Sequence, residues 1–145
     1  MGYEAAFREA VAHICSSIKN LDAEDERVEY SLPCRYRFLD TGAHISYKEA
    51  GDGDETETDI SVNDGEITVA RRGGVTSKIV FREGFAHSSL YSLGTYSFDM
   101  SVTTRGVRVA LGENGGRLDI LYKMTVGGAE KDVRFSVRIE GAAAE

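Results

Sequence analysis

An alternation of apolar and polar residues near the C-terminus is the feature that most constrains the fold. Two runs, 118–126 and 133–139, place apolar residues at every second position, and Gly127-Gly128 separates them. Side chains in a β-strand alternate between its two faces, so each run predicts a strand with one apolar face. Paired glycines can adopt the positive φ angles of a tight turn, and the two runs therefore predict a β-hairpin.

Similar runs recur along most of the chain. Short turn signals separate them, among them Asp40-Thr41-Gly42, Asn63-Asp64-Gly65 and Arg82-Glu83-Gly84, and Thr104-Arg105-Gly106 lies between two further runs. Sequential hairpins without a long crossover favour an up-and-down meander, and closure of the meander removes exposed sheet edges. The sequence therefore predicts an all-β fold, a single antiparallel up-and-down β-barrel of about 8–10 strands.

The barrel is expected to occupy residues 10–140 of a single domain that spans the 145 residues, with 1–9 as an N-terminal extension and 141–145 as a disordered tail. Pro33 falls inside the alternating run 28–38. Proline lacks a backbone N–H, so it predicts an edge, a bend or a bulge within that strand.

The N-terminal segment is ambiguous. Its apolar residues follow helical spacing: Tyr3, Phe7, Ala10, Val11, Ile14, Ile18 and Leu21. A strand would place only Ala12, Ile14, Ser16 and Ile18 on one face. Local spacing and the propensities of Ala and Glu favour a helix.

Charge and cysteine content narrow the function classes. The net charge of −7 argues against nucleic acid and against an anionic membrane surface as partners. No apolar run approaches the ~20 residues that cross a bilayer, and the N-terminal segment lacks a signal-peptide core, so a cytoplasmic protein is expected.

The two cysteines are too far apart for a disulfide. Cys15 would lie opposite about residue 31 in a hairpin, too far along the strand from Cys34, so two free thiols are predicted.

Several short patterns together resemble the YwiB-like proteins, a bacterial family without an assigned function. They are Ile45–Glu49, the stretch from Ile67 to Gly73 with Arg71, Phe81 before Gly84, Tyr91, and the closing runs from Leu118 to Ile139. The resemblance implies a calycin-like β-barrel in a cytoplasmic setting and a first strand at about Ala10–Ser17, in place of the helix. It implies no catalytic residues.

No motif predicts catalysis or a metal site. The three histidines, His13, His44 and His87, lie far apart in sequence, so neither a metal nor a cofactor is expected. Arg71-Arg72-Gly73-Gly74 lacks the helix that a phosphate loop requires and is interpreted as a turn, with Arg71 as a half-buried residue that ties neighbouring turns. A non-enzymatic protein is therefore expected.

A ligand site in the barrel lumen is the sharpest functional hypothesis. Some polar residues have the same parity as the apolar residues and should therefore face the lumen. We expect a site for a small apolar or amphipathic molecule, lined by His87, Ser89, Tyr91, Ser77, Thr58 and Tyr122. Arg134 and Arg138 have the opposite parity to Phe135 and Val137, which disfavours a lumenal anchor for a ligand carboxylate. The alternative is a barrel filled by its own side chains that acts as a protein–protein interaction module or homodimer.

Overall fold

The computed structural model describes residues 6–20, 24–50 and 54–141, and these residues form ten β-strands. The strands are β1 (Arg8–Asn20), β2 (Glu26–Leu39), β3 (Gly42–Ala50), β4 (Glu55–Asn63), β5 (Glu66–Gly73), β6 (Val75–Phe81), β7 (Ala86–Leu93), β8 (Tyr96–Gly112), β9 (Gly115–Val126) and β10 (Ala129–Glu140). In the described part of the chain, no helix is long and apolar enough to span a membrane.

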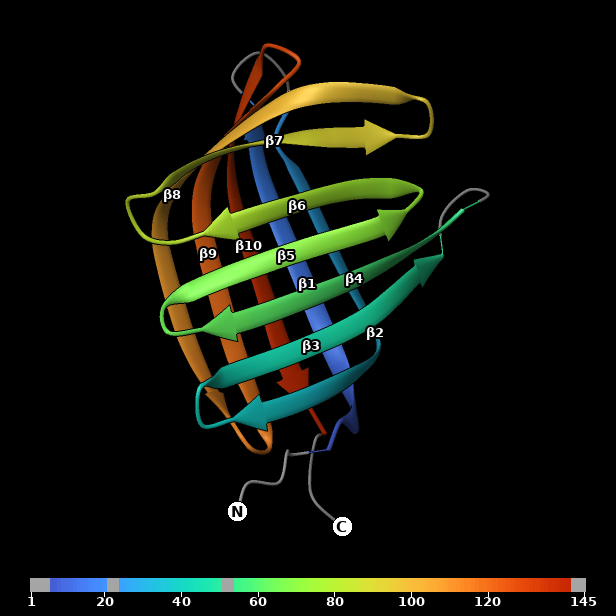
Figure 1. Cartoon of the computed structure of the whole chain (residues 1–145), viewed down its shortest axis with the longest axis vertical. Coiled ribbons are helices and arrows are strands. Elements are labelled where there is room, and N and C mark those ends of the chain that lie inside the picture. Colours follow the sequence, from blue (N-terminus) through green and yellow to red (C-terminus); the bar gives the residue numbers. More distant parts are fainter. Residues whose placement is uncertain (1–5, 21–23, 51–53, 142–145) are drawn as a thin grey trace.

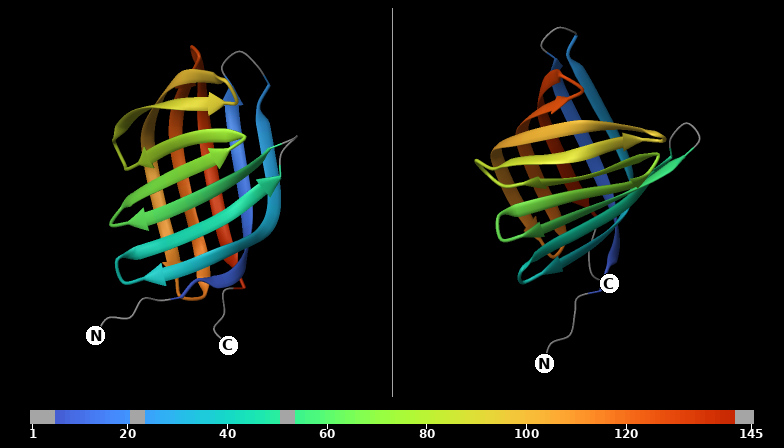
Figure 2. Two further views of the ribbon diagram at one scale, coloured as in Figure 1. Left: turned by 45° about the vertical axis from the view of Figure 1, so that its right-hand side comes forward. Right: turned by 45° about the horizontal axis from the view of Figure 1, so that its top comes forward.

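The strands form one closed barrel. Each strand pairs antiparallel with its neighbours in sequence, and β1 also pairs with β10. Strands β3 to β6 cross at an angle over β1, β9 and β10 (Figures 1 and 2). Closure gives every strand two neighbours, so the predicted up-and-down barrel is confirmed. Its strands span Arg8 to Glu140, close to the predicted 10–140, and of the predicted tail only Gly141 lies within the described residues.

Two-residue turns fix the register of the hairpins. Gly127 and Gly128, between β9 and β10, have φ angles of 57° and 84°, and Asp64 and Gly65, between β4 and β5, have 49° and 80°. Positive φ at both central positions gives the turn whose twist matches that of the flanking strands. The hairpin predicted at the C-terminus is therefore confirmed.

The N-terminal segment is a strand, so the helix favoured by local spacing is wrong and the strand implied by the family resemblance is correct. β1 pairs with β2 from Arg8 to Ile18 and with β10 from Val11 to Asn20. Ala10, Ala12 and Ile14 point into the core. The two ladders that close the barrel outweigh the helix propensity of this segment, which is a weak preference.

Two long strands differ in detail from the sequence pattern. Residues 104–106 form a β-bulge within continuous β8, where we had placed a break between two runs. In β2, pairing with β3 begins only at Arg35, whereas pairing with β1 extends from Glu26 to Tyr36. Pro33 therefore lies where β2 has one unpaired edge, as the missing N–H predicts. Beyond it, β2 bends from β1 towards β3 (Figure 1).

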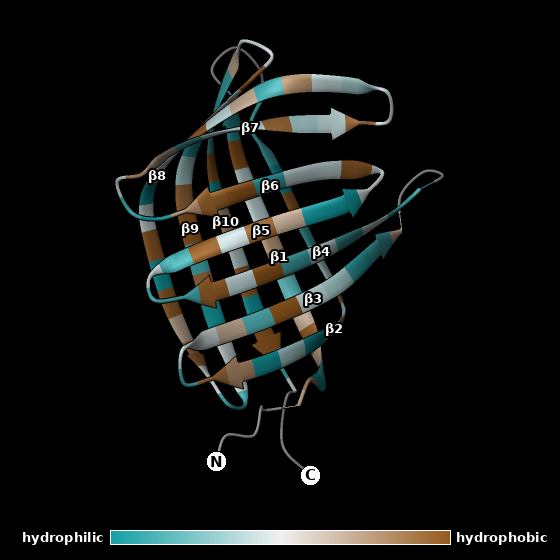
Figure 3. Cartoon of the chain, in the orientation of Figure 1, coloured by the Kyte–Doolittle hydropathy of each residue, from teal (hydrophilic) through white to brown (hydrophobic). Residues whose placement is uncertain are grey.

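The core fills one part of the lumen. Bands of hydrophobic and hydrophilic residues alternate along β3, β4 and β5 (Figure 3), and the hydrophobic set faces inwards. Seven aliphatic side chains there have no exposed surface: Ala12, Ile45, Ile60, Ile67, Leu118, Ile120 and Val137. Tyr36 is also buried, and its hydroxyl donates to the Gly112 carbonyl at 2.6 Å. This tight packing is what a self-filled small barrel requires.

Both cysteines are free, as predicted. Cys15 pairs in register with Glu29, two residues from the expected partner position, and Cys34 pairs with Ala10. Cys34 points into the core, whereas Cys15 has the opposite parity and lies on the outer face. The barrel wall therefore separates the two thiols.

Candidate functional site: a polar cluster in the lumen

Polar side chains gather inside the barrel beyond the aliphatic core. A row across four adjacent strands contains Tyr47, Thr58, Arg71 and Ser77, each paired in register with the next. All have the inward parity of their strands, because they continue the alternation of Ile45, Ile60, Val69 and Ile79. With Tyr30, Glu49, Tyr91 and Tyr122 they form what we call the lumenal polar cluster.

Solvent reaches this part of the lumen. Tyr30, Glu49, Arg71 and Tyr91 have inward parity but are only half-buried, as is Tyr122. The aliphatic rows at the other end of the same strands are fully buried. The lumen is therefore closed over the aliphatic rows and over Tyr47, Thr58 and Ser77, and it becomes accessible at the half-buried members of the cluster.

Glu49 is the carboxylate of the cluster. The hydroxyl of Tyr30 donates to one of its oxygens at 2.8 Å, and that of Thr58 approaches the other at 3.4 Å. Burial, followed by this hydrogen bond, raises the pKa of Tyr30 far above its ordinary value. Tyr30 therefore remains a neutral donor at any physiological pH, and Glu49 is held by two hydroxyls.

Arg71 supplies the positive charge. Burial raises the pKa of Tyr47 strongly and that of Tyr122 to about 12, and the guanidinium of Arg71 partly offsets the rise at both. Its charge acts on Tyr30 in the same way. Arg71 has the inward parity of β5 and lies in register between Thr58 and Ser77, so it faces the same side of the wall as these phenols.

Four of the six residues predicted to line a site fall within the cluster. Thr58 and Ser77 are buried on either side of Arg71. Tyr91 and Tyr122 are close enough for Tyr91 to raise the pKa of Tyr122, although burial is the larger cause.

The other two predicted residues lie further along β7. His87 and Ser89 pair with Val102 and Met100 and are half-buried. Strands β6 and β7 pair only at Val75–Leu93 and Thr76–Ser92. His87 and Ser89 therefore lie on the part of β7 that has no backbone ladder to β6. These two side chains therefore flank an incompletely bonded stretch of the wall.

The sequence argument missed the charged members. Arg134 and Arg138 are exposed on the outer face, as predicted. The expectation that a lumenal carboxylate anchor is disfavoured rested on these two residues alone, and it did not consider Arg71, which has inward parity. The available signal was parity, since Arg71 shares its face with Ile67 and Val69. Its place beside two glycines led to its interpretation as part of a turn.

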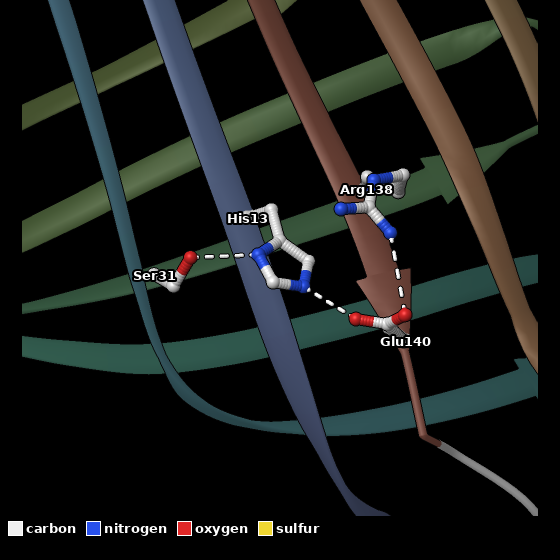
Figure 4. A network of polar contacts seen from close by, with 4 residues as sticks. All are labelled: His13, Ser31, Arg138 and Glu140. Carbon is white, nitrogen blue, oxygen red and sulfur yellow. Dashed lines mark hydrogen bonds and ion pairs between the residues drawn. The ribbon is translucent and has the colours of Figure 1, made fainter.

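The histidines have no metal-like arrangement. No group of three or more His, Cys, Asp or Glu side chains in the described ranges could hold a metal ion. His13 contacts Ser31 at 2.6 Å and Glu140 at 2.7 Å on the outer face, where Arg138 joins Glu140 at 3.6 Å (Figure 4). His44 contacts Ser61 at 2.9 Å. The His13 network links β1, β2 and β10 where the barrel closes.

The outer wall over β1, β2, β9 and β10 is also hollowed. Arg134 borders three adjoining hollows, one of about 610 Å³ over Cys15 and Ser136. Three other arginines on this wall each meet a carboxylate two residues along the same strand: Arg27 with Glu29 at 3.3 Å, Arg117 with Asp119 at 3.0 Å and Arg138 with Glu140 at 3.6 Å. These exposed pairs neutralise most of the local charge, so the lumen is the better candidate for a binding site.

Comparison with known proteins shows the family of this chain. It belongs to the family described as a domain of unknown function (DUF1934), whose sequence model matches residues 12–139. A curated relative is the uncharacterized beta-barrel protein YwiB of Bacillus subtilis (strain 168), 26% identical over 130 residues, which cover 89% of this chain and 91% of the relative. The crystal structure of ywiB protein from Bacillus subtilis is similar, with a TM-score of 0.85, 25% identity and 94% of each chain covered. Neither name assigns a catalytic activity.

Proposed function

We propose that this protein binds a small apolar or amphipathic molecule in the barrel lumen, at the lumenal polar cluster. The contrast between the closed and the accessible parts of the lumen carries this proposal. Seven aliphatic core side chains have no exposed surface, whereas Tyr30, Glu49, Arg71 and Tyr122 have inward parity and are only half-buried. Small-molecule sites typically combine an apolar wall with a few convergent polar groups.

The β7–β8 hairpin supplies an apolar wall beside the cluster. Leu93, Tyr96 and Phe98 continue the inward parity of Met100, yet they are 42%, 72% and 39% exposed. Large apolar side chains on an inward face are normally covered by the opposite wall. Their exposure supports an unfilled space beneath the hairpin, next to Tyr91, which pairs with Phe98.

The stretch of wall between β6 and β7 is the natural access route. Only two residue pairs join these strands, so separating them breaks few backbone hydrogen bonds. Regions with few such bonds open at low free-energy cost. A ligand can therefore pass Ser89 and Tyr91 without disturbing the aliphatic core.

The proposed role is non-catalytic and cytoplasmic. Two free thiols support a reducing compartment. The alternative role is a protein–protein interaction module or homodimer with a filled barrel. On the outer parity the exposed large apolar residues Val11, Leu90 and Leu121 lie on three different strands, which favours the ligand-binding role.

Native mass spectrometry of protein purified from a bacterial host, compared with the same sample under denaturing conditions, tests the proposal. We expect extra mass that is lost on denaturation. Ser89→Leu fills inward-facing space beside the access route and should reduce the bound fraction, whereas the outward-facing neighbour variant Ser88→Leu should retain it. Bare monomer mass for the wild-type protein would contradict the proposal, and a clean dimer without extra mass would favour the interaction module.

A further inference from the structure

Arg71 has no direct ion-pair partner among the described residues, although Glu49 lies in the same cluster. The Nε of Arg71 is buried and has no hydrogen-bond partner. Within the described residues, the structure records no ion pair between Arg71 and a carboxylate, and Glu49 instead accepts from Tyr30 and Thr58. Burying a guanidinium donor without an acceptor is costly, so such groups in folded proteins are normally paired.

Tyr47 provides a second unused donor in the same row. Its side chain is 3% exposed, and its hydroxyl has no acceptor for its own proton; the Thr58 hydroxyl lies close enough to donate to it, which lowers the pKa of Tyr47. Thr58 on β4 lies between Tyr47 on β3 and Arg71 on β5. The backbones of Tyr47 and Arg71 are therefore two strand spacings, about 10 Å, apart. Two inward-pointing donors at that separation can converge on one acceptor group between them.

We propose that the lumen selects amphipathic molecules with a singly charged anionic head group, bound by the Arg71 guanidinium and the Tyr47 hydroxyl. This inference rests on the proposed lumenal binding and specifies its ligand class. A carboxylate or sulfonate supplies the acceptors that both donors lack, and charge-assisted hydrogen bonds of this kind are the strong ones.

Glu49 limits the charge of the head group. It lies in the same cluster as Arg71. Its negative charge raises the pKa of Tyr30 and Tyr47, whereas the positive charge of Arg71 lowers the pKa of both. A second negative charge on the ligand would meet this carboxylate without a second cation to offset it. The cluster therefore favours a monoanion over a phosphomonoester, and Leu93 and Phe98 offer the surface for its apolar part.

Two fluorescent dyes with the same ring system separate the claim that the lumen binds a small molecule from the claim that it selects an anionic head group. Anilinonaphthalene sulfonate carries one negative charge, and N-phenyl-naphthylamine is its uncharged counterpart. Wild-type protein is expected to bind both. Arg71→Met should weaken binding of the anionic dye by roughly tenfold or more, as expected for loss of a charge-assisted hydrogen bond, and should change binding of the neutral dye less than about twofold.

Arg72→Met is the matched control. Arg72 is the next residue of the same strand, carries the same charge and lies on the outer face, where it contacts Glu57 at 2.7 Å. This variant should bind both dyes as the wild type does. Tyr47→Phe is a second test that removes only the unpartnered hydroxyl, and it should weaken the anionic dye severalfold. Circular dichroism checks that each variant is folded.

The outcomes distinguish this inference from the proposed function. Equal binding of the anionic dye by Arg71→Met and wild-type protein, or equal weakening in Arg71→Met and Arg72→Met, would overturn the anionic-ligand inference. Binding of the neutral dye alone would overturn it while leaving the lumenal site intact. Failure of the wild type to bind either dye would overturn the proposed function itself. In competition against the bound dye, decanoate should displace it more strongly than decyl phosphate or decanol, and the reverse order would contradict the monoanion assignment.

Discussion

Replacing Arg71 by methionine should stabilise the unliganded protein. A buried donor without a partner costs about 1–3 kcal/mol, and Arg71 Nε is such a donor. The rest of the side chain is accessible, so we expect the lower end of that range, a gain of about 1 kcal/mol in the free energy of unfolding. Methionine keeps a long apolar stem of similar length in the lumen. For a domain of this size the melting temperature should rise by roughly 3 °C.

Urea unfolding of ligand-free protein measures this effect, with Arg72→Met as the control. Arg72 is 69% exposed and contacts Glu57 at 2.7 Å and Asp59 at 3.5 Å. Exposed pairs contribute about 0.2–1 kcal/mol, so this variant should be neutral or slightly destabilised. The two neighbouring substitutions should therefore have effects of opposite sign. If Arg71→Met destabilises the protein more than Arg72→Met does, Arg71 is satisfied in the unliganded barrel and the reasoning is refuted.

Three further predictions concern the core, the thiols and the barrel closure. Ile120→Ala removes a fully buried side chain and should cost about 2–5 kcal/mol in urea unfolding; a loss below about 1 kcal/mol would mean a loosely packed core. Iodoacetamide at mildly alkaline pH should modify Cys15 before Cys34, because burial raises the pKa of Cys34 to about 11, and mass spectrometry of digested protein would expose the opposite order. The hydrogen bond from His13, followed by the charge of Arg138, lowers the pKa of Glu140 below its ordinary 4.5. The stabilisation from Glu140 is therefore present above that value and lost as the pH falls through the lower folded pKa, so Glu140→Gln should be less stable than wild type at neutral pH, and the difference should shrink as the pH falls below 4.5.

Alternation along the strands made most of the architecture predictable. Parity correctly assigned Phe135 and Val137 to the inner face, and both are buried. Turn chemistry at Gly127-Gly128 gave the final hairpin, because few residues other than glycine accept positive φ at two successive positions. Local spacing failed at β1, because its ladders to β2 and to the distant β10 decide the structure and a helical window does not register either pairing.

The site was predictable only in part. Parity placed Thr58, Ser77, Tyr91 and Tyr122 on the inner face, but it could not show how far the aliphatic core fills the lumen. The depth of filling depends on the shear and closure of the barrel, which only the three-dimensional register defines. Arg71 was expected to be half-buried but not to line the ligand site, because its place before Gly73 and Gly74 indicated a turn.

The central claim is that the accessible half of the lumen binds a small molecule. Nuclear magnetic resonance of isotope-labelled protein titrated with decanoate tests it most directly, because the side-chain Nε–H of Arg71 and the backbone amide of Tyr47 can be followed individually. We predict saturable shift changes at these two groups and at Tyr122, with the Nε–H of Arg72 unmoved. An unchanged Arg71 signal at saturating decanoate, or shifts confined to the outer wall around Arg134, would contradict the account.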